Sequence, residues 1–345
     1  MKEIYRQLLF KYPTEYLNRE SRYLSRLRTF IIEGARKMRK IVTHKSCDID
    51  AISSVWLLKR FYPNWDGAEV NFVNAGEGLF GHEESAVGDH LKAVEIIDGV
   101  ETIHVDTGMG ALDHHQTADN NTCGASLTLQ FILSNPESSI HKHEIKQEAV
   151  KRIVELVIDD DHFQEVYYPD SNHDIYEFGI VSIIQGYKLN HQKDDQGLVN
   201  FVMECLDAIL QNLEKKIWAE REMKEKGIEF ESKWGKAMGV ETINDEVLKL
   251  AQMMGYKIAV RKDPDGGFVR IKAMPDKRQG TGGSGQEAVS LGIDLTESYE
   301  KLKEMDSEAS WFLHASKRML LNGSSKNPEM KGTSLTLEQV IEVLK

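Results

Sequence analysis

Cysteine and proline are scarce in this chain, which has three cysteines and seven prolines among 345 residues. Three cysteines in a chain of this length argue against a disulfide framework, and Cys47, Cys123 and Cys205 lack the spacing of a zinc site. A reducing cytoplasm is therefore the expected location. The sequence also lacks an apolar run close to the roughly 20 residues that a membrane span needs, so we expect no membrane insertion.

Positive charge is scarce as well, because 43 Lys and Arg face 55 Asp and Glu, for a formal net charge of −12. A chain this acidic is not an obvious nucleic-acid binder through its overall field. The charge is uneven, since residues 1–40 carry a surplus of about seven positive charges. A solvated helix face is the simpler interpretation of this basic stretch, and contact with RNA or a partner protein is the alternative.

The apolar pattern of the first half predicts strands that alternate with helices. Short β-type runs cover 41–43, 70–73 and 102–105, helices are expected at 51–61, 124–133 and 145–157, and 112–115 is interpreted as another strand end. This order predicts an α/β fold with a mostly parallel sheet flanked by helices. In such sheets the ligand site lies beyond the carboxyl ends of the strands, where His44, Asp106 and Asp113 fall.

The second half has a different texture. A charged helix at 197–226 precedes a hairpin at 256–260 and 268–271, a glycine-rich loop at 280–285, and further helices near 297–305 and from 335. The loop lacks the Lys-Ser/Thr ending of a phosphate-binding P-loop, so we interpret it as a flexible linker. The expected domains are a basic helical extension (1–39), a metal-binding catalytic domain (40–195), a linker helix (196–227) and a smaller α/β domain (228–345).

The first group of chemically suggestive residues lies on one loop, where His44, Asp48 and Asp50 follow a strand and precede a helix. Hard divalent cations prefer carboxylate oxygen, and Mn²⁺ also accepts imidazole. This spacing is consistent with a metal site. The alternative is that Asp48 and Asp50 only cap the helix that follows.

A second group consists of Asp106, at the end of an apolar strand, and the run Asp113-His114-His115. Adjacent side chains in an extended segment point to opposite sides, so one histidine can bind metal while the other faces a substrate. Paired histidines alone are often incidental. Their occurrence together with the first group favours a shared site.

A third group, Asp159-Asp160-Asp161, falls at the end of a predicted helix. Carboxylates there oppose the negative end of the helix dipole, and a bound cation would offset that cost. The apolar face of the helix continues to Asp161, with Asp160 as the alternative. A solvated acidic turn is the alternative to a bound cation.

In order and spacing, these motifs resemble the DHH phosphoesterase superfamily over residues 40–165. That superfamily includes manganese-dependent pyrophosphatases, RecJ-type exonucleases, nanoRNases and cyclic dinucleotide phosphodiesterases. The resemblance implies two divalent metal ions, with Mn²⁺ favoured over Mg²⁺, and catalytic roles for Asp106, Asp113 and His115, the last facing the substrate phosphate or acting as a general acid. The implied metal ligands are, for one ion, His44, Asp48 and Asp106 and, for the other, Asp50, Asp106, His114 and Asp161 (or Asp160).

Two further motifs are similar to the melanocyte-proliferating-gene family, whose members act as RNA exonucleases. They are the tetrapeptide 113–116, Asp-His-His-Gln, and the segment 312–316 followed by Asn-Gly at 322–323. The first loop departs from that family, which has an extra histidine and a glutamate there. The resemblance implies a DHHA1-like second domain that binds substrate phosphate. The implied contacts are His314, Ser316, Arg318, Asn322 and Gly323.

The sequence thus predicts hydrolysis of a phosphodiester in a nucleotide or short oligonucleotide, with RNA preferred. A cyclic dinucleotide or a phosphoanhydride is the alternative within the enzyme class. A non-catalytic protein that keeps the fold to bind a nucleotide or nucleic acid is the alternative outside it. The oligomeric state stays open, with a homodimer as one alternative.

Overall fold

The computed structural model describes residues 38–79, 93–276, 292–323, 327 and 329–345. Contacts divide the chain into two compact units. The first runs to residue 139 and includes 160–162 and 184–200, and the second comprises 140–159, 163–183 and 201–345. The basic extension predicted for 1–39, apart from its last two residues, and the loop 280–285 lie outside the described residues. The predicted domain boundaries stay predictions.

The first unit contains a four-stranded sheet with the strand order β2-β1-β4-β3. Strand β1 is central and pairs in parallel with β2 and β4, whereas β3 is antiparallel to β4 at one edge. The prediction of a mostly parallel α/β sheet is therefore confirmed. The elements are β1 (Arg39–His44), α3 (Ile49–Phe61), β2 (Glu69–Val73), β3 (Glu95–Ile97), β4 (Val100–His104) and α4 (Gly124–Ser134).

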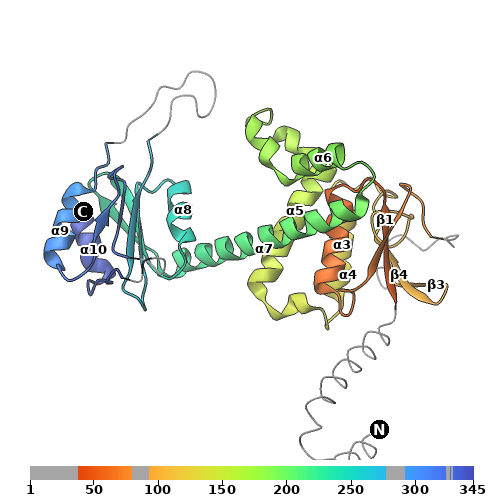
Figure 1. Ribbon diagram of the computed structural model, residues 1–345, viewed down its shortest axis with the longest axis horizontal. Helices are drawn as coiled ribbons and strands as arrows, with labels where there is room; N and C mark the ends of the chain where they lie inside the picture. Colours follow the sequence, from red (N-terminus) through yellow and green to blue (C-terminus); the bar gives the residue numbers. More distant parts are fainter. Residues whose placement is uncertain (1–37, 80–92, 277–291, 324–326, 328) are drawn as a thin grey trace, which may run out of the picture. The chain divides into compact units, whose positions relative to one another are not determined.

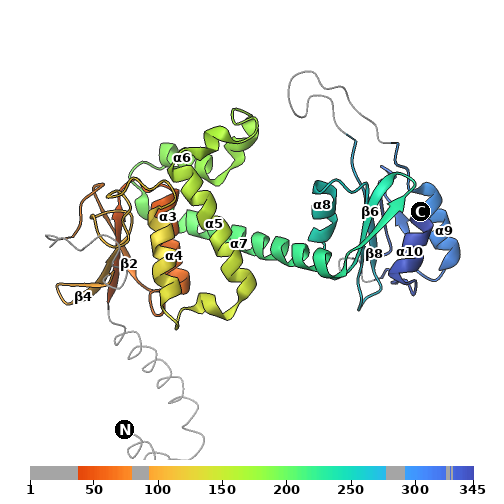
Figure 2. The same cartoon turned by 180° about the vertical axis from the view of Figure 1, so that it is seen from behind.

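Burial explains why β1 forms the centre of this sheet. Ile41, Val42 and Thr43 are completely buried, as expected for a parallel strand that is covered on both faces. Helices α3 and α4 lie side by side on one face of the sheet, as both views show (Figures 1 and 2). Helix α3 begins at Ile49, two residues before the predicted start, because Asp48 caps it.

The prediction of a strand end at 112–115 is wrong, because this segment forms turns. The Asp106 N–H donates to the carbonyl of Leu112 at 3.0 Å, and the Met109 N–H donates to the Asp113 carboxylate at 2.7 Å. The backbone of this segment is thus paired within its own loop and not with a neighbouring strand.

Several helical elements follow the first sheet. Within the second unit, an ion pair joins helix α5 (Glu144–Asp161) to helix α7 (Asp195–Lys226). The Arg152 guanidinium lies 2.6 Å from carboxylate oxygens of both Glu148 and Glu220. No helix of the described part of the chain has the length and apolarity needed to cross a membrane. These elements are η2 (Ser139–Lys142), α5 (Glu144–Asp161), η3 (Gln164–Tyr167), η4 (Asp174–Phe178), α6 (Ile180–Asn190) and α7 (Asp195–Lys226).

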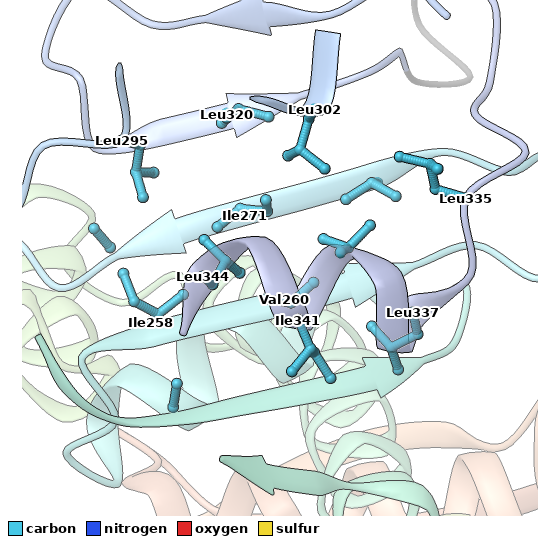
Figure 3. Close-up of a cluster of buried hydrophobic side chains, with 14 of the residues drawn as sticks. Ile258, Val260, Ile271, Leu295, Leu302, Leu320, Leu335, Leu337, Ile341 and Leu344 are labelled. Atoms are coloured by element: carbon cyan, nitrogen blue, oxygen red, sulfur yellow. The ribbon is translucent and has the colours of Figure 1, made fainter. Parts of the chain in front are cut away.

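The second unit contains a six-stranded mixed sheet with the order β5-β6-β7-β8-β10-β9. The predicted hairpin is present as antiparallel β7 and β8, and helix α10 packs on the sheet through Leu337, Ile341 and Leu344 (Figure 3). The elements are β5 (Ile228–Ser232), β6 (Gly235–Glu241), α8 (Glu246–Met253), β7 (Ile258–Lys262), β8 (Val269–Ala273), α9 (Thr296–Met305), β9 (Phe312–Leu313), β10 (Met319–Leu321) and α10 (Leu337–Leu344).

Candidate metal centre

The ends of two parallel strands and the end of one helix bring the acidic residues and histidines of the first unit together. His44 is the last residue of β1, and Asp106 follows the neighbouring β4 by two residues. Parallel strands have their carboxyl ends at the same edge of a sheet. Helix α5 ends at Asp161, which belongs to the same compact unit.

Asp106 lies between two histidines. Its Oδ2 is 3.3 Å from Nε2 of His44, and its Oδ1 is 3.4 Å from Nε2 of His114. Oδ2 of Asp161 lies 3.5 Å from the same nitrogen of His114. Potential ligand atoms thus form two groups, His44-Asp48-Asp106 and His114-Asp161-His162, while Asp106 and His114 also group with His115.

Three atoms at the centre are buried and have no hydrogen-bond partner: Asp106 Oδ1, His114 Nε2 and Asp161 Oδ2. Leaving one buried polar atom unpaired costs about 1–3 kcal/mol, and here three such atoms converge. Two carboxylate oxygens and one imidazole nitrogen are ligands that Mn²⁺ accepts. The residues present therefore fit a divalent cation.

The tautomer of His44 follows from its hydrogen bond. Its Nδ1 lies 2.8 Å from the carbonyl oxygen of Lys45, and a carbonyl can only accept, so Nδ1 carries the proton. Nε2 then faces Asp106 and Asp48, the latter at 3.6 Å. This arrangement is the one by which proteins orient a metal-binding histidine.

Asp48 has two roles, one for each oxygen. Its Oδ1 accepts the N–H of Ala51 at 3.0 Å and caps α3, while Oδ2 faces His44. The predicted alternatives, a cap or a metal ligand, are therefore compatible in this residue.

Asp50 does not cap α3. It is buried, and its carboxylate accepts the N–H groups of Gly124 and Ala125, both at 2.7 Å, at the N-terminus of α4. Its Oδ2 also lies 3.7 Å from Nε2 of His114. Burial and the charges of Asp106 and Asp161 raise the pKa of Asp50 well above its usual range. A nearby cation would reverse this effect.

Gly124 is a site residue that sequence reasoning missed. A Cβ at this position would lie 2.9 Å from both the Cβ of Asp106 and Oδ2 of Asp50. A larger residue here would therefore have to displace both Asp106 and the Asp50 carboxylate, or shift the start of α4. Asp106 itself has a φ of 52°, in the left-handed region that Asp and Asn adopt more readily than most other residues.

His115 is held differently from His114. Its side chain is 58% exposed, and its Nδ1 lies 2.7 Å from Oδ1 of Asp113. Asp113 is buried and also accepts the backbone N–H groups of Met109 and His115. Asp113 therefore fixes the orientation of the His115 ring.

The structure separates the three consecutive aspartates. Asp161 contributes to the cluster and Asp160 does not, while Asp159 accepts a hydrogen bond from Tyr168 at 2.9 Å. His162, another residue that the prediction did not include, lies 3.6 Å from Asp161 and pairs through Nε2 with the carbonyl of Thr122 at 3.0 Å. The sequence signal that could have indicated His162 is its position directly after the predicted ligand Asp161.

The residues predicted to bind substrate belong to the second unit. His314 and Ser316 are exposed and pair with each other at 2.8 Å, and the Arg318 guanidinium donates to Asp276 at 2.6 Å. Asn322 is fully buried and its Oδ1 accepts the Val269 N–H at 2.6 Å. The amide oxygen of Asn322 thus holds β8, and the predicted contact of Asn322 with substrate stays a prediction. The buried Gly323 has a φ of 105°.

Comparison with known proteins gives weak likenesses only. No protein-family profile matches the chain, and no curated protein matches it. Among solved structures it is similar to an uncharacterized protein from Helicobacter pylori G27 (11% identity, covering 89% of this chain and 99% of that one, TM-score 0.22). It is also similar to the DHH domain of a member of a family of ribosomal proteins (12% identity, covering 100% of this chain and 97% of that one, TM-score 0.27). A third similar structure is an exopolyphosphatase-related protein from Bacteroides fragilis (10% identity, covering 89% of this chain and 90% of that one, TM-score 0.23). These TM-scores are too low to say anything about the chemistry of the site, which is therefore argued from the geometry of its own residues.

Cation binding to this cluster is expected to release protons. Burial lowers the pKa of His44, but its contacts with the carboxylates of Asp106 and Asp48 raise it to about 10. The Asp106 carboxylate, 3.4 Å from Nε2 of His114, raises the pKa of His114 to about 9. Both imidazoles therefore carry protons at neutral pH, and a metal ion binds only the neutral form. Affinity should rise with pH, by about tenfold per unit for each displaced proton, until pH exceeds these values.

Calorimetric titration with Mn²⁺ in buffers of different ionisation enthalpy measures this release, and about two protons are expected at pH 7. The exposed His143→Gln variant is the matched control and should leave the number unchanged. A heat of binding that does not depend on the buffer contradicts the prediction.

Proposed function

We propose that this chain is a metal-dependent phosphodiester hydrolase of the DHH superfamily. The observation that carries the proposal is the convergence of the buried, unpaired atoms of Asp106, His114 and Asp161. The resemblance of motifs in the sequence agrees with it, because the same residues that match the superfamily motifs meet in one cluster. Buried carboxylates packed around one imidazole without hydrogen bonds have little value for stability alone.

In the proposed centre, Asp106 would belong to both groups of ligands, because one of its oxygens faces each group. His44 and Asp48 lie on one side of it, and His114 and Asp161 lie on the other, with Asp50 beside His114. These residues would hold two divalent cations, which would supply a lowered pKa of bound water and stabilisation of charge on a phosphoryl group. Asp50 keeps α4 fixed behind the ligands through its two backbone hydrogen bonds.

His115 is proposed as the general acid. Asp113 holds its Nδ1–H, and the exposed ring can donate the Nε2 proton to the leaving oxygen of a substrate. Because Asp113 accepts three hydrogen bonds from 109 and 115, the ring stays fixed as the proton moves. The exposed His314 and Ser316 of the second unit remain proposed substrate contacts.

A His115→Gln variant is expected to lose turnover and keep its cations. General acid catalysis contributes about 10²–10⁴-fold, so kcat should fall by that factor while Mn²⁺ affinity changes little. Steady-state kinetics and calorimetric titration measure the two quantities. A large loss of Mn²⁺ affinity would instead make His115 a ligand.

The proposal is tested by Mn²⁺-dependent hydrolysis of a small panel: short 5′-labelled RNA, short DNA, cyclic di-AMP and pyrophosphate. Short RNA is the expected substrate from the resemblance, and cleavage of cyclic di-AMP or pyrophosphate would move the proposal to another branch of the superfamily. No cleavage of any substrate by protein shown to contain metal would overturn the hydrolase proposal in favour of a non-catalytic nucleotide-binding protein.

A further inference from the structure

A cavity adjoins the loop of the proposed metal ligands within the first unit. It has a volume of about 550 Å³ and lies between the loop after β1 and the turn that joins α6 to α7. This volume is within the range of about 300–1,000 Å³ that small-molecule sites occupy. Its lining includes Lys45, Ser46, Tyr187, Lys188, His191 and Lys193.

Cationic groups in this cavity have hydrogen-bonding capacity left for an anion. The Lys188 ammonium donates to the carbonyl of Ser46 at 2.9 Å, and that of Lys45 donates to Asn74 at 3.0 Å. An ammonium has three donors, so each of these retains two. Lys193 adds a third ammonium to the lining.

The two carboxylates of the cavity are occupied by the protein itself. Asp195 accepts the N–H of Ser46 at 2.7 Å. Asp194 accepts the N–H of Gly197 at 2.9 Å and the hydroxyl of Tyr187 at 3.2 Å. Three ammonium groups against two carboxylates leave a formal surplus of one positive charge (3 − 2 = 1) in a chain of net charge −12.

Aromatic rings form another part of the wall. Tyr187 and His191 stack with their ring centroids 4.3 Å apart and an interplanar angle of 28°. Flat rings beside cationic groups are the combination that binds a nucleotide, because a base stacks on the ring and the phosphate pairs with the cation. A pocket for inorganic anions alone would not need the rings.

The cavity shares its loop with the metal ligands. Lys45 and Ser46 lie between His44 and Asp48 in the sequence. A ligand in the cavity therefore lies beside the proposed metal centre.

We propose that this cavity binds a nucleotide unit next to the scissile phosphodiester, with its phosphate on the lysines and its base on the Tyr187–His191 pair. This inference rests on the proposed function and deepens it, because it requires a nucleotide on at least one side of the hydrolysed bond. Pyrophosphate lacks the base that the rings would contact.

The test measures binding of 5′-AMP to the full-length protein in EDTA, so that its readout depends on neither metal nor turnover. Lys193→Gln removes an ammonium placed to pair with the phosphate, and His191→Ala removes a ring placed to stack on the base, so each variant is expected to weaken binding by about threefold to tenfold. Neither variant alters the Lys188 and Asp195 bonds that hold Ser46. The exposed Lys142→Gln is the matched control and should bind 5′-AMP like the wild type.

Hydrogen exchange of the wild type is measured alongside, and 5′-AMP should protect residues 187–195. Unchanged affinity in both variants, or protection elsewhere only, overturns the proposal. Displacement of 5′-AMP by an equal concentration of pyrophosphate would also overturn it, because the site would then bind a charged phosphate without needing a base. Mn²⁺ affinity of the same variants should equal that of the wild type, so loss of the nucleotide site is distinguishable from failure of the metal centre.

Discussion

Asp106→Asn is expected to remove the stabilisation that Mn²⁺ gives to the wild type and to reduce hydrolysis by more than about 100-fold. At a free concentration of 100 times Kd, a cation stabilises the folded protein by about 2.7 kcal/mol, which corresponds to a rise in Tm of roughly 5–10 °C for a unit of this size. The variant should show almost none of this rise. Loss of even an outer partner of a metal ligand costs about 10–100-fold, and Asp106 is placed to contact both cations directly.

The physical reason lies in the two oxygens of Asp106, each of which faces a different histidine. An asparagine keeps one oxygen and presents an amide N–H₂ group, which repels a cation, on the other side. The backbone should tolerate the change, because Asn also adopts the left-handed conformation that Asp106 has.

Thermal unfolding with and without Mn²⁺ measures the first effect, and hydrolysis of the cleaved substrate measures the second. Asp98→Asn is a closely matched control, because Asp98 is exposed and also has a left-handed φ of 50°. Equal stabilisation of the Asp106 and Asp98 variants by Mn²⁺ would remove Asp106 from the proposed centre.

Gly124→Ala is expected to destabilise the protein by about 1–3 kcal/mol and to weaken Mn²⁺ binding at least about tenfold. The new methyl group would lie 2.9 Å from the Cβ of Asp106 and from Oδ2 of Asp50, and such overpacking costs about 1–3 kcal/mol. Both contacts must be relieved by movement of Asp50 and Asp106 or of the start of α4, and we expect this to change the cation site as well as the fold.

Gly186→Ala separates this effect from a general gain in helix propensity. Gly186 lies within α6, and a Cβ there would meet no atom within 4 Å. That variant should be more stable than the wild type by about 0.5–1 kcal/mol. Denaturant unfolding and calorimetric Mn²⁺ titration measure both variants. A Gly124→Ala protein with wild-type Mn²⁺ affinity would show that the carboxylates can move without consequence.

The periodicity of apolar residues predicted the parallel strands of the first unit correctly, because strand formation depends on neighbouring residues in the sequence. The buried run at 41–43 indicated β1, and the apolar run before Asp106 indicated β4. Residues 112–115 were assigned wrongly because their backbone bonds are made within a loop that depends on Asp106 and Asp113. No local pattern records such pairing.

The parts of the site that the sequence did not indicate depend on contacts between distant residues. Asp50 and Gly124 are 74 positions apart, and only the packing of α3 against α4 makes the missing side chain of Gly124 necessary. Asn322 shows the opposite case. Its chemistry suggested a phosphate contact, but its place beside Val269 uses its amide for the sheet.

The double role of Asp48 affects which residues would be retained in related chains that no longer bind metal. A descendant that lost its cations would still be under selection to keep Asp48, because the cap on α3 contributes about 1 kcal/mol. Asp106 and Asp161 have no such second use for their buried oxygens, and drift would replace them once the metal was no longer needed. If the proposed function is correct, retention of Asp106, His114 and Asp161 would distinguish active descendants from inactive ones, whereas retention of Asp48 would not.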